Sequence, residues 1–379
     1  MTADAVRRLG WAAPAPGELE LLRAALLPPD EAAIAWRRWL VDHDVDSATY
    51  RSQQILAAVS ANLPADVLGV DAGRLLGLRK RTWVTNQVKL EALGRALDVL
   101  RPLQTLSIVT KGAAIITSEC GDASVRSMYD SDVVVDEAHF SDALVLLRDA
   151  GWTESSRFVE RPINHSADLV DPEGNGLDLH RWVVFPRFAR KVESGWYART
   201  VAHEVRGRSC RRFETADELV LAILHGLVVD TPSSVRWPLD VAQLAKAGQR
   251  LSGGADRFWG NVVQAANEVD ACRHVGLGLD LCRAEFGLDV PPDVIAHLTQ
   301  TGGDRYLGVE RWLRRRGIPN PAPFVRIYVD TERHAGRRPT PYGFVLMRTA
   351  HHGEFKTVAR GRWERARSAV EVRRQRLRW

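Results

Sequence analysis

A change of hydrophobic period along the chain constrains the fold more than any other feature. From Glu18 to about Leu63, apolar residues recur at spacings of three and four, as they do on one face of an α-helix. Between residues 103 and 190, short β-branched runs typical of strands replace this pattern. From residue 215 the helical period returns. We therefore expect an α+β block between two helical regions.

The turn and breaker residues divide these regions into elements. Pro28 and Pro29 interrupt the first helical stretch, and Pro102 ends a helix predicted over 82–100 with one buried stripe that includes Trp83 and Val88. In the central block we predict strands near 103–112 and 131–136, a helix over 140–150, and a hairpin of 165–171 with 176–185. Later helices are predicted over 216–230, 241–251, 258–271 and 275–286. The predicted domains are an N-terminal helical region (1–80), a core (81–205), a helical domain (206–300) and a basic extension (301–379).

Charge is distributed unevenly along the 379 residues. From Arg311 to Trp379 the chain carries 18 Lys and Arg against 5 Asp and Glu, so this extension has a net charge of +13 and the rest −8. Such an extension can bind a polyanion, or it can be a solvated arginine-rich helix. A strand is also predicted at 325–329 and a helix at 354–379.

Several protein classes are excluded or disfavoured by composition and motif. The chain is 45% hydrophobic and 26% charged, which is typical of a globular protein and not of a disordered one. Its four cysteines lack the C-x2-C spacing of zinc knuckles, and no P-loop or Rossmann glycine motif occurs. The first twenty residues contain no apolar secretory core, so we expect a cytoplasmic protein without a membrane segment.

Paired acidic residues mark the second predicted strand. Asp130 and Asp132 lie at positions i and i+2, so both carboxylates project from one face of the strand, with their Cα atoms about 6.5 Å apart. Two such carboxylates repel each other unless a cation bridges them. Mg²⁺ or Mn²⁺ suits this arrangement, because these ions bind one or two carboxylates together with substrate phosphates.

A third acid follows in the predicted hairpin. In Leu177-Asp178-Leu179-His180, alternation places Asp178 and His180 on the face opposite the leucines. If this strand lies beside the first acidic strand, Asp178 completes a cluster of three carboxylates. His180 can orient an acid or contact a nucleotide, although a histidine on a half-buried strand is often structural.

Positive and small residues precede the acids. Lys111 and Gly112 end the first strand-like run and open a helix-like segment, which allows the backbone to approach a phosphate. Arg126 offers a guanidinium suited to phosphate oxygens. The alternatives are a surface lysine and an ion-pair partner of the nearby acids.

In this order the elements resemble the uncharacterised-nucleotidyltransferase family of the DNA-polymerase-β-like superfamily. The family pattern is KG-A, R-x3-D-x-D with apolar residues, A-x2-L-x4-G, a lone His and D-L-H. The matching residues here are Lys111 to Ala114, Arg126 to Val135, ALVLLRDAGW, His165 and Asp178-Leu179-His180. Downstream, His225 and Trp237-Pro238-Leu239-Asp240 are similar to the family's H…W-x2-D segment. The resemblance covers roughly residues 80–290.

The resemblance implies a polymerase-β-like α+β core, a small mixed sheet with helices, and a role for each site residue. Asp130, Asp132 and Asp178 would be metal ligands, with Asp178 also the base for the acceptor hydroxyl. Lys111, Gly112, Arg126 and His180 would bind the nucleotide. Two departures stand out: no serine follows Gly112, and Ser131 replaces an apolar residue between the acids.

The implied activity is metal-dependent transfer of a nucleoside monophosphate from an NTP, such as ATP, to a hydroxyl acceptor. The sequence leaves the acceptor open among a small molecule, a protein side chain and RNA, and we expect no DNA sequence readout. The alternative is a non-catalytic nucleotide- or RNA-binding regulatory or accessory protein on the same scaffold. Affinity for RNA that falls steeply with salt and disappears on deleting 311–379 would indicate RNA binding through the extension.

Overall fold

The computed structural model describes most of the chain. The described residues are Val6, Leu9, 13–103, 107–118, 121–154, 166–183, 195–229, 234–301 and 338–340. The chain divides into two compact units, Met1–Pro319 and Asn320–Trp379. The strand predicted at 325–329, the helix predicted at 354–379 and His165 lie outside the described residues. The description that follows concerns the first unit.

The first unit begins with helices separated by proline and turn residues. Helices α2 (Pro16–Leu26) and α3 (Pro29–Asp42) both have proline in the first turn, where its missing N–H costs nothing. Helix α4 (Tyr50–Asn62) is capped by the Thr49 side chain, which accepts a hydrogen bond from the Ser52 amide at 3.2 Å. A short helix α5 (Ala65–Leu68) and a 3₁₀ turn η2 (Gly69–Asp71) follow. The predicted break at Pro28 and Pro29 is confirmed.

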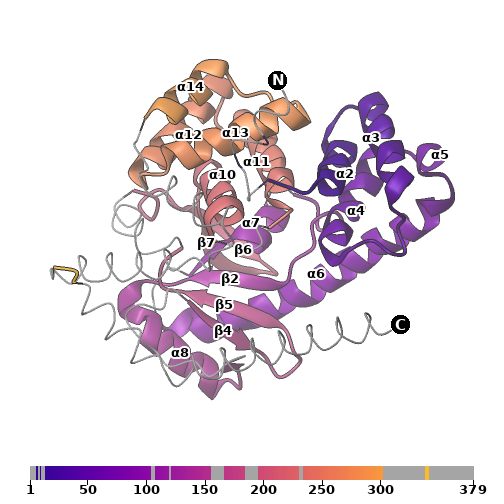
Figure 1. The fold of residues 1–379 in the computed structure, drawn as a ribbon. Helices are drawn as coiled ribbons and strands as arrows, with labels where there is room; N and C mark the ends of the chain where they lie inside the picture. The colour runs from indigo at the N-terminus through magenta and orange to yellow at the C-terminus, as the bar shows by residue number, and fades with distance from the viewer. Residues whose placement is uncertain are drawn as a thin grey trace, which may run out of the picture. The chain divides into compact units, whose positions relative to one another are not determined.

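A 29-residue helix, α6 (Ala72–Leu100), leads from these helices to the sheet and packs against both α4 and β2 (Figure 1). It begins ten residues before the predicted start at residue 82. The predicted buried stripe is wrong at Trp83 and Val88, because each of these side chains is 50% exposed. Asn86 is buried instead, and its side chain makes hydrogen bonds to the backbone at Ala123, Arg126 and Met128. Helix α6 therefore holds the segment that precedes the acidic strand.

In the part of the chain that the structure describes, seven strands form one mixed sheet in the order β3-β4-β5-β2-β1-β7-β6 (Figure 1). The strands are β1 (Ile108–Thr110), β2 (Asp130–Val134), β3 (Thr153–Glu154), β4 (Ser166–Val170), β5 (Gly176–His180), β6 (Val201–Val205) and β7 (Arg208–Arg212). The β2–β5 and β1–β7 pairs are parallel and the other pairs are antiparallel. The predicted α+β class and the predicted β4–β5 hairpin are confirmed. The β6–β7 hairpin, which ends at Arg212, was not predicted. It adds two strands at one edge of the sheet.

The two faces of the sheet differ in chemistry. One face, here the core face, carries Val109, Val133, Leu177 and Leu179, which pack with α6 and α8 (Phe140–Asp149) in one apolar cluster. The other face, here the acid face, carries the polar residues that alternate with them. Helix α7 (Lys111–Thr117) follows β1 directly and contacts α10 (Thr215–Leu224). Burial of one face and polar residues on the other give each strand a fixed register.

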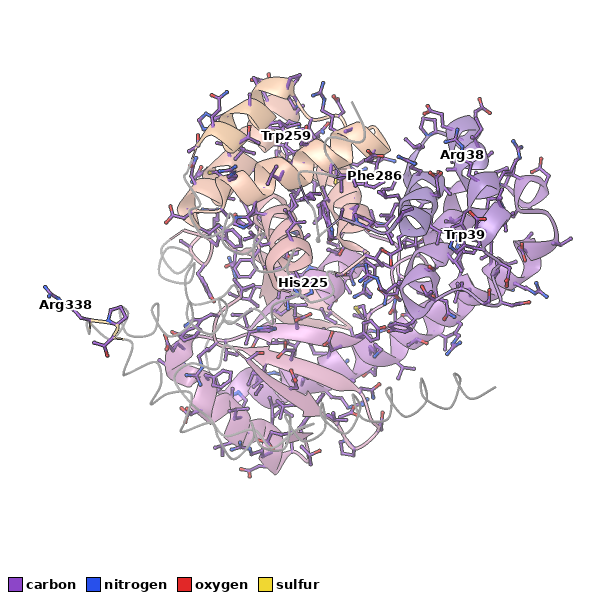
Figure 2. All side chains as sticks on the ribbon, viewed as in Figure 1. Arg38, Trp39, His225, Trp259, Phe286 and Arg338 are labelled. Atoms are coloured by element: carbon purple, nitrogen blue, oxygen red, sulfur yellow. The ribbon has the colours of Figure 1, made fainter. Side chains whose placement is uncertain are left out.

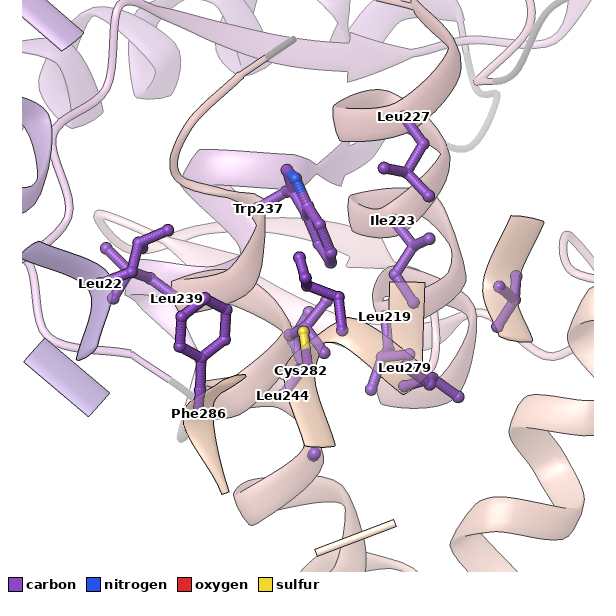
Figure 3. Close-up of a cluster of buried hydrophobic side chains, with 14 of the residues drawn as sticks. Leu22, Leu219, Ile223, Leu227, Trp237, Leu239, Leu244, Leu279, Cys282 and Phe286 are labelled. Carbon is purple, nitrogen blue, oxygen red and sulfur yellow. The ribbon is translucent and has the colours of Figure 1, made fainter. Parts of the chain in front are cut away.

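Among the described residues, five helices follow the sheet. Helix α10 is followed by α11 (Trp237–Leu251), α12 (Ala255–Glu268), α13 (Cys272–Phe286) and α14 (Pro292–Gln300). Figure 3 shows their shared core, in which Leu22 of α2 lies beside Leu239 and Phe286. A π-helical turn (His225–Val229) continues α10, and His225 lies between the C-terminal helices and the sheet (Figure 2). Within the described residues, the helices are too short or too polar to cross a membrane.

Ser131 provides a test of the core face. It is 2% exposed, and its buried hydroxyl has no hydrogen-bond partner among the described residues. A buried hydroxyl without a partner costs about 1–3 kcal/mol. We therefore expect Ser131→Ala to raise the free energy of unfolding by about 1 kcal/mol, measured by urea denaturation. A loss of stability would show that the hydroxyl is hydrogen-bonded.

Candidate acidic site

Four polar residues form a row across the acid face. The register aligns Thr110 of β1 with Asp132, Asp132 with Asp178 of β5, and Asp178 with Asp168 of β4. Neighbouring strands lie about 4.8 Å apart, so three carboxylates follow one another across the sheet. The parallel β2–β5 pair brings the D-x-D and D-L-H segments together, which is the condition that the sequence analysis set for a carboxylate cluster.

His180 joins the two central carboxylates. Its Nε2 atom lies 3.0 Å from Oδ1 of Asp132 and 2.9 Å from Oδ2 of Asp178. These three residues form the acid–histidine cluster, in which one ligand atom from each lies within 4.8 Å of the others. Asp132 and His180 are buried, and Asp178 is half-buried. The cluster is therefore a set of potential metal ligands in an environment that favours pairing with a cation.

Lys111 adds a second positive charge to the cluster. Its Nζ atom donates a hydrogen bond to Oδ1 of Asp132 at 2.5 Å and lies 3.4 Å from Nε2 of His180. Burial opposes charge on the lysine, but the charges of Asp132 and Asp178 raise its pKa. Burial also lowers the pKa of His180, but Asp178 and Asp132 have the larger effect and raise it to about 9.

The carboxylates respond in the opposite sense. Burial would raise the pKa of Asp132, but Lys111 and His180 lower it well below its usual range. His180 and Lys111 also lower the pKa of Asp178 against the effect of burial. Two ionised acids and two cations therefore stand together near neutral pH, with their charges balanced.

Asp130 lies on the acid face at the start of β2, outside the acid–histidine cluster as defined above. The residue is exposed at the surface, but desolvation by the surrounding protein and the charge of Asp132 raise the pKa of its carboxyl group to about 6, against the effect of Lys111. Gly176 is its partner on β5, so no side chain separates it from that strand. Asp130 is thus in electrostatic contact with the cluster and is readily protonated below neutral pH.

The guanidinium of Arg126 lies against the backbone of Gly112. Nε and Nη2 of Arg126 donate to the two carboxylate oxygens of Asp240 at 2.6 and 2.9 Å, and both side chains are buried. A Cβ atom added at Gly112 would lie 2.3 Å from Nη1 of Arg126. Glycine is therefore required here for the close approach of the guanidinium. Arg126 is therefore an ion-pair partner, as the alternative stated, but of Asp240 in α11 and not of the nearby acids. Its contact with a phosphate stays a prediction.

A buried glutamate fixes the turn between β1 and α7. Glu218 of α10 accepts hydrogen bonds from the Thr110 hydroxyl at 2.8 Å and from the Lys111 amide at 3.1 Å. Lys111 has a φ of 52°, which is rare for a residue other than glycine. Glu218 thus holds the backbone in the conformation that directs the Lys111 side chain to Asp132.

The titration of Glu218 makes this contact testable. Burial raises its pKa from 4.5 to about 8, against the hydrogen bonds from Thr110 and Lys111. An acid with a raised pKa in the folded chain favours folding fully below its unfolded pKa and loses that contribution as the pH rises to the folded pKa. The loss is at most about 1.4 kcal/mol per pH unit.

We expect the Glu218→Gln protein to lose less unfolding free energy than the wild type between pH 5 and 8, because glutamine does not titrate. The comparison uses urea unfolding at several pH values in this range. Since all other groups are shared by the two proteins, the difference between the curves isolates Glu218. Parallel curves would show that its pKa is not raised.

The sequence did not single out three residues that build the site. Asp168 faces Asp178 across the predicted hairpin, and burial together with the charge of Asp178 raises its pKa. Pairing the two hairpin strands by their alternation could have identified it. Glu218 and Asn86 act from helices far away in the sequence, where no local pattern marks them.

Burial and the charge of Lys111 lower the pKa of His225 to about 3, so this histidine is neutral beside the site.

The donor set fits a divalent cation. The carboxylates of Asp132 and Asp178 converge on Nε2 of His180, so a positive centre already stands between them. Mg²⁺ and Mn²⁺ prefer carboxylate oxygens, and a neutral imidazole can also bind Mn²⁺. Asp130 adds a fourth candidate ligand at the edge of the cluster.

The chain is similar to a protein family and to a solved structure. A family model described as an uncharacterised nucleotidyltransferase matches residues 48–287. Among solved structures, the chain is similar to an antigenic nucleotidyltransferase-like protein from Paracoccidioides brasiliensis, with 16% identity and a TM-score of 0.33 over 55% of this chain and 97% of that one. No curated protein sequence matches the chain. The matched segment contains the sheet and all the acids described above.

Proposed function

Because the chain belongs to the uncharacterised nucleotidyltransferase family, we propose that it transfers a nucleoside monophosphate from an NTP to an acceptor hydroxyl. In this reaction the acceptor oxygen bonds to the α-phosphorus, the bond between the α-phosphorus and the bridging oxygen breaks, and pyrophosphate leaves. The convergence of Asp132, Asp178 and His180 within 4.8 Å carries the proposal.

The three aspartates would bind the metal ion and accept the proton. Asp130, Asp132 and Asp178 would hold Mg²⁺ or Mn²⁺, and a bound ion would acidify the acceptor hydroxyl and neutralise phosphate charge. Asp178 would accept the proton of the acceptor. Its lowered pKa makes it a weak base, so the hydroxyl must be acidified before transfer.

The positive residues would bind the triphosphate. Lys111 would exchange part of its contact with Asp132 for a phosphate oxygen, since its ammonium group has three donors. Gly112 would allow the backbone to approach the triphosphate closely. Arg126 would neutralise part of the phosphate charge. His180, whose Nε2 atom lies 3.0 Å from the same oxygen of Asp132 that Lys111 contacts, would bind the nucleotide beside Lys111.

The proposal is tested by incubating the full chain with each α-³²P-labelled NTP, Mg²⁺ or Mn²⁺, and cell extract. We expect one NTP to label a metabolite, a protein or an RNA, with release of pyrophosphate. Fractionating the labelled product identifies the acceptor class. Nucleotide binding with neither label transfer nor pyrophosphate release under any of these conditions would contradict the proposal.

One observation favours a non-catalytic nucleotide-binding role as the second candidate. Lys111 and His180 already neutralise Asp132 and Asp178, so the acids are balanced without a metal ion. A regulatory protein that binds nucleotides without transferring them could keep this arrangement. Nucleotide affinity that does not depend on a divalent cation would favour this role.

A further inference from the structure

Two tyrosines that the proposed reaction does not use lie side by side next to the acids. Tyr50 is the first residue of α4, and Tyr129 directly precedes Asp130. They are 57% and 46% exposed, and their ring centroids are 5.4 Å apart with a tilt of 51°. Most tryptophan and phenylalanine side chains among the described residues are buried. Two exposed rings from distant segments therefore form an aromatic pair at the surface.

Polar contacts hold Tyr129 in place despite its exposure. Nε2 of Gln54 donates a hydrogen bond to the Tyr129 hydroxyl at 3.1 Å. The Lys89 ammonium group donates to the Tyr129 carbonyl, and the guanidinium of Arg236 lies 5.2 Å from the ring centroid. Fixing the ring before a ligand arrives reduces the entropy lost on binding.

Arg236 connects the aromatic pair with the acids. It donates to the Ser127 carbonyl, while its buried Nε atom has no hydrogen-bond partner among the described residues. Burial and the charge of Arg126 lower its pKa to about 10, and the charges of Asp240 and Asp130 act in the opposite direction. A half-buried guanidinium with an unused donor, beside the exposed ring of Tyr129, indicates a ligand with both a planar ring and hydrogen-bond acceptors.

We propose that Tyr50, Tyr129 and Arg236 form a binding subsite for the nucleobase of the NTP. This inference rests on the proposed function, because that function places the triphosphate on the acids beside Tyr129. Consecutive Cα atoms are 3.8 Å apart, so the subsite begins one residue from Asp130. A nucleotide carries its base one ribose away from its phosphates, which fits an aromatic pair adjacent to a cation-binding cluster. Stacking on tyrosine accepts any base, whereas Arg236 would favour a base with acceptor atoms at its edge.

The test compares a ligand that has a base with one that lacks it. Binding of Mg²⁺–NTP and of Mg²⁺–tripolyphosphate to the full chain is measured by isothermal titration calorimetry. Loss of stacking costs about 1–3 kcal/mol per base, so the Tyr50→Ala/Tyr129→Ala double variant should bind the NTP about 5- to 150-fold more weakly. Its affinity for tripolyphosphate should stay within about twofold of the wild type.

Two further variants serve as controls. Tyr129→Phe keeps the ring and loses only the bond to Gln54, so it should retain most of the NTP affinity. Trp83→Ala removes another half-exposed aromatic side chain, from α6, and should change neither affinity. Thermal unfolding of every variant checks that the fold is retained.

The outcomes separate this inference from the proposed function. Asp132→Asn should weaken both ligands. If it does so while the tyrosine double variant binds the NTP like the wild type, the subsite is wrong and the acid site stands. Equal weakening of both ligands by the double variant would also overturn the subsite. If the wild type binds no NTP with Mg²⁺ or Mn²⁺, both proposals fail.

Discussion

Replacing Asp132 by asparagine is expected to reduce nucleotidyl transfer by about 10²- to 10³-fold or more. Asparagine keeps the size of the side chain but removes the charge on which Lys111 and His180 converge. Without that charge, Asp178 and Asp130 alone would have to balance a divalent cation. Label transfer from the preferred α-³²P-NTP, measured over time, gives the size of the loss.

The fold should survive the Asp132→Asn change. A buried ion pair usually costs several kcal/mol when one partner is removed. Here His180 can lose its proton, so one positive charge disappears together with the negative one. Asp149→Asn is the matched control, because this exposed aspartate lies in α8 on the core-face side of the sheet. An Asp132→Asn protein that folds and transfers at the wild-type rate would refute the catalytic assignment.

Breaking the pair between Arg126 and Asp240 is expected to destabilise the protein by about 3–5 kcal/mol. The two hydrogen bonds at 2.6 and 2.9 Å join the segment before β2 to α11, and both side chains are buried. Arg126→Met leaves a buried carboxylate without its partner. Asp240→Asn leaves Arg126 beside Arg236, whose charge repels it. Equilibrium unfolding in urea measures each loss.

The double variant Arg126→Met/Asp240→Leu separates stability from binding. Two apolar side chains of similar size can replace a buried ion pair at little cost, so most of the lost stability should return. If Arg126 also neutralises phosphate charge, the double variant should remain poor in transfer although it is stable. Stability that does not recover would show that the cost arises from packing around Gly112 rather than from an unpaired charge.

The sequence predicted the parts of the fold that have a clear period. The alternation in Leu177-Asp178-Leu179-His180 indicated the correct face for Asp178 and His180, and their assembly with Asp132 followed from pairing β5 with β2. The β6–β7 hairpin was missed because Arg208-Ser209-Cys210-Arg211-Arg212 lacks apolar alternation. The stripe of α6 was wrong at Trp83 because apolarity alone does not show which face meets a partner. Asn86 is buried there because three backbone groups need its amide.

Long-range contacts limited the prediction of the site in the same way. The neutralisation of Asp132 by His180 depends on the register of the parallel β2–β5 pair, which the hairpin pattern does not determine. The pairing of Arg126 with Asp240 spans 114 residues, and the contact of Glu218 with Lys111 spans 107. Such pairs depend on how α10 and α11 pack against the sheet. No local spacing in the sequence encodes that packing.

The first helices limit how far the protein can be truncated at its N-terminal end. The family match begins at residue 48, but α2 and α3 end before it. Helix α2 packs against α4, α11 and α13, and Leu21, Leu22 and Trp36 belong to the same apolar core as the C-terminal helices. An excised fragment 48–287 would present that surface to water and aggregate. The segment shared with the family is therefore shorter than the segment needed for a soluble, folded protein.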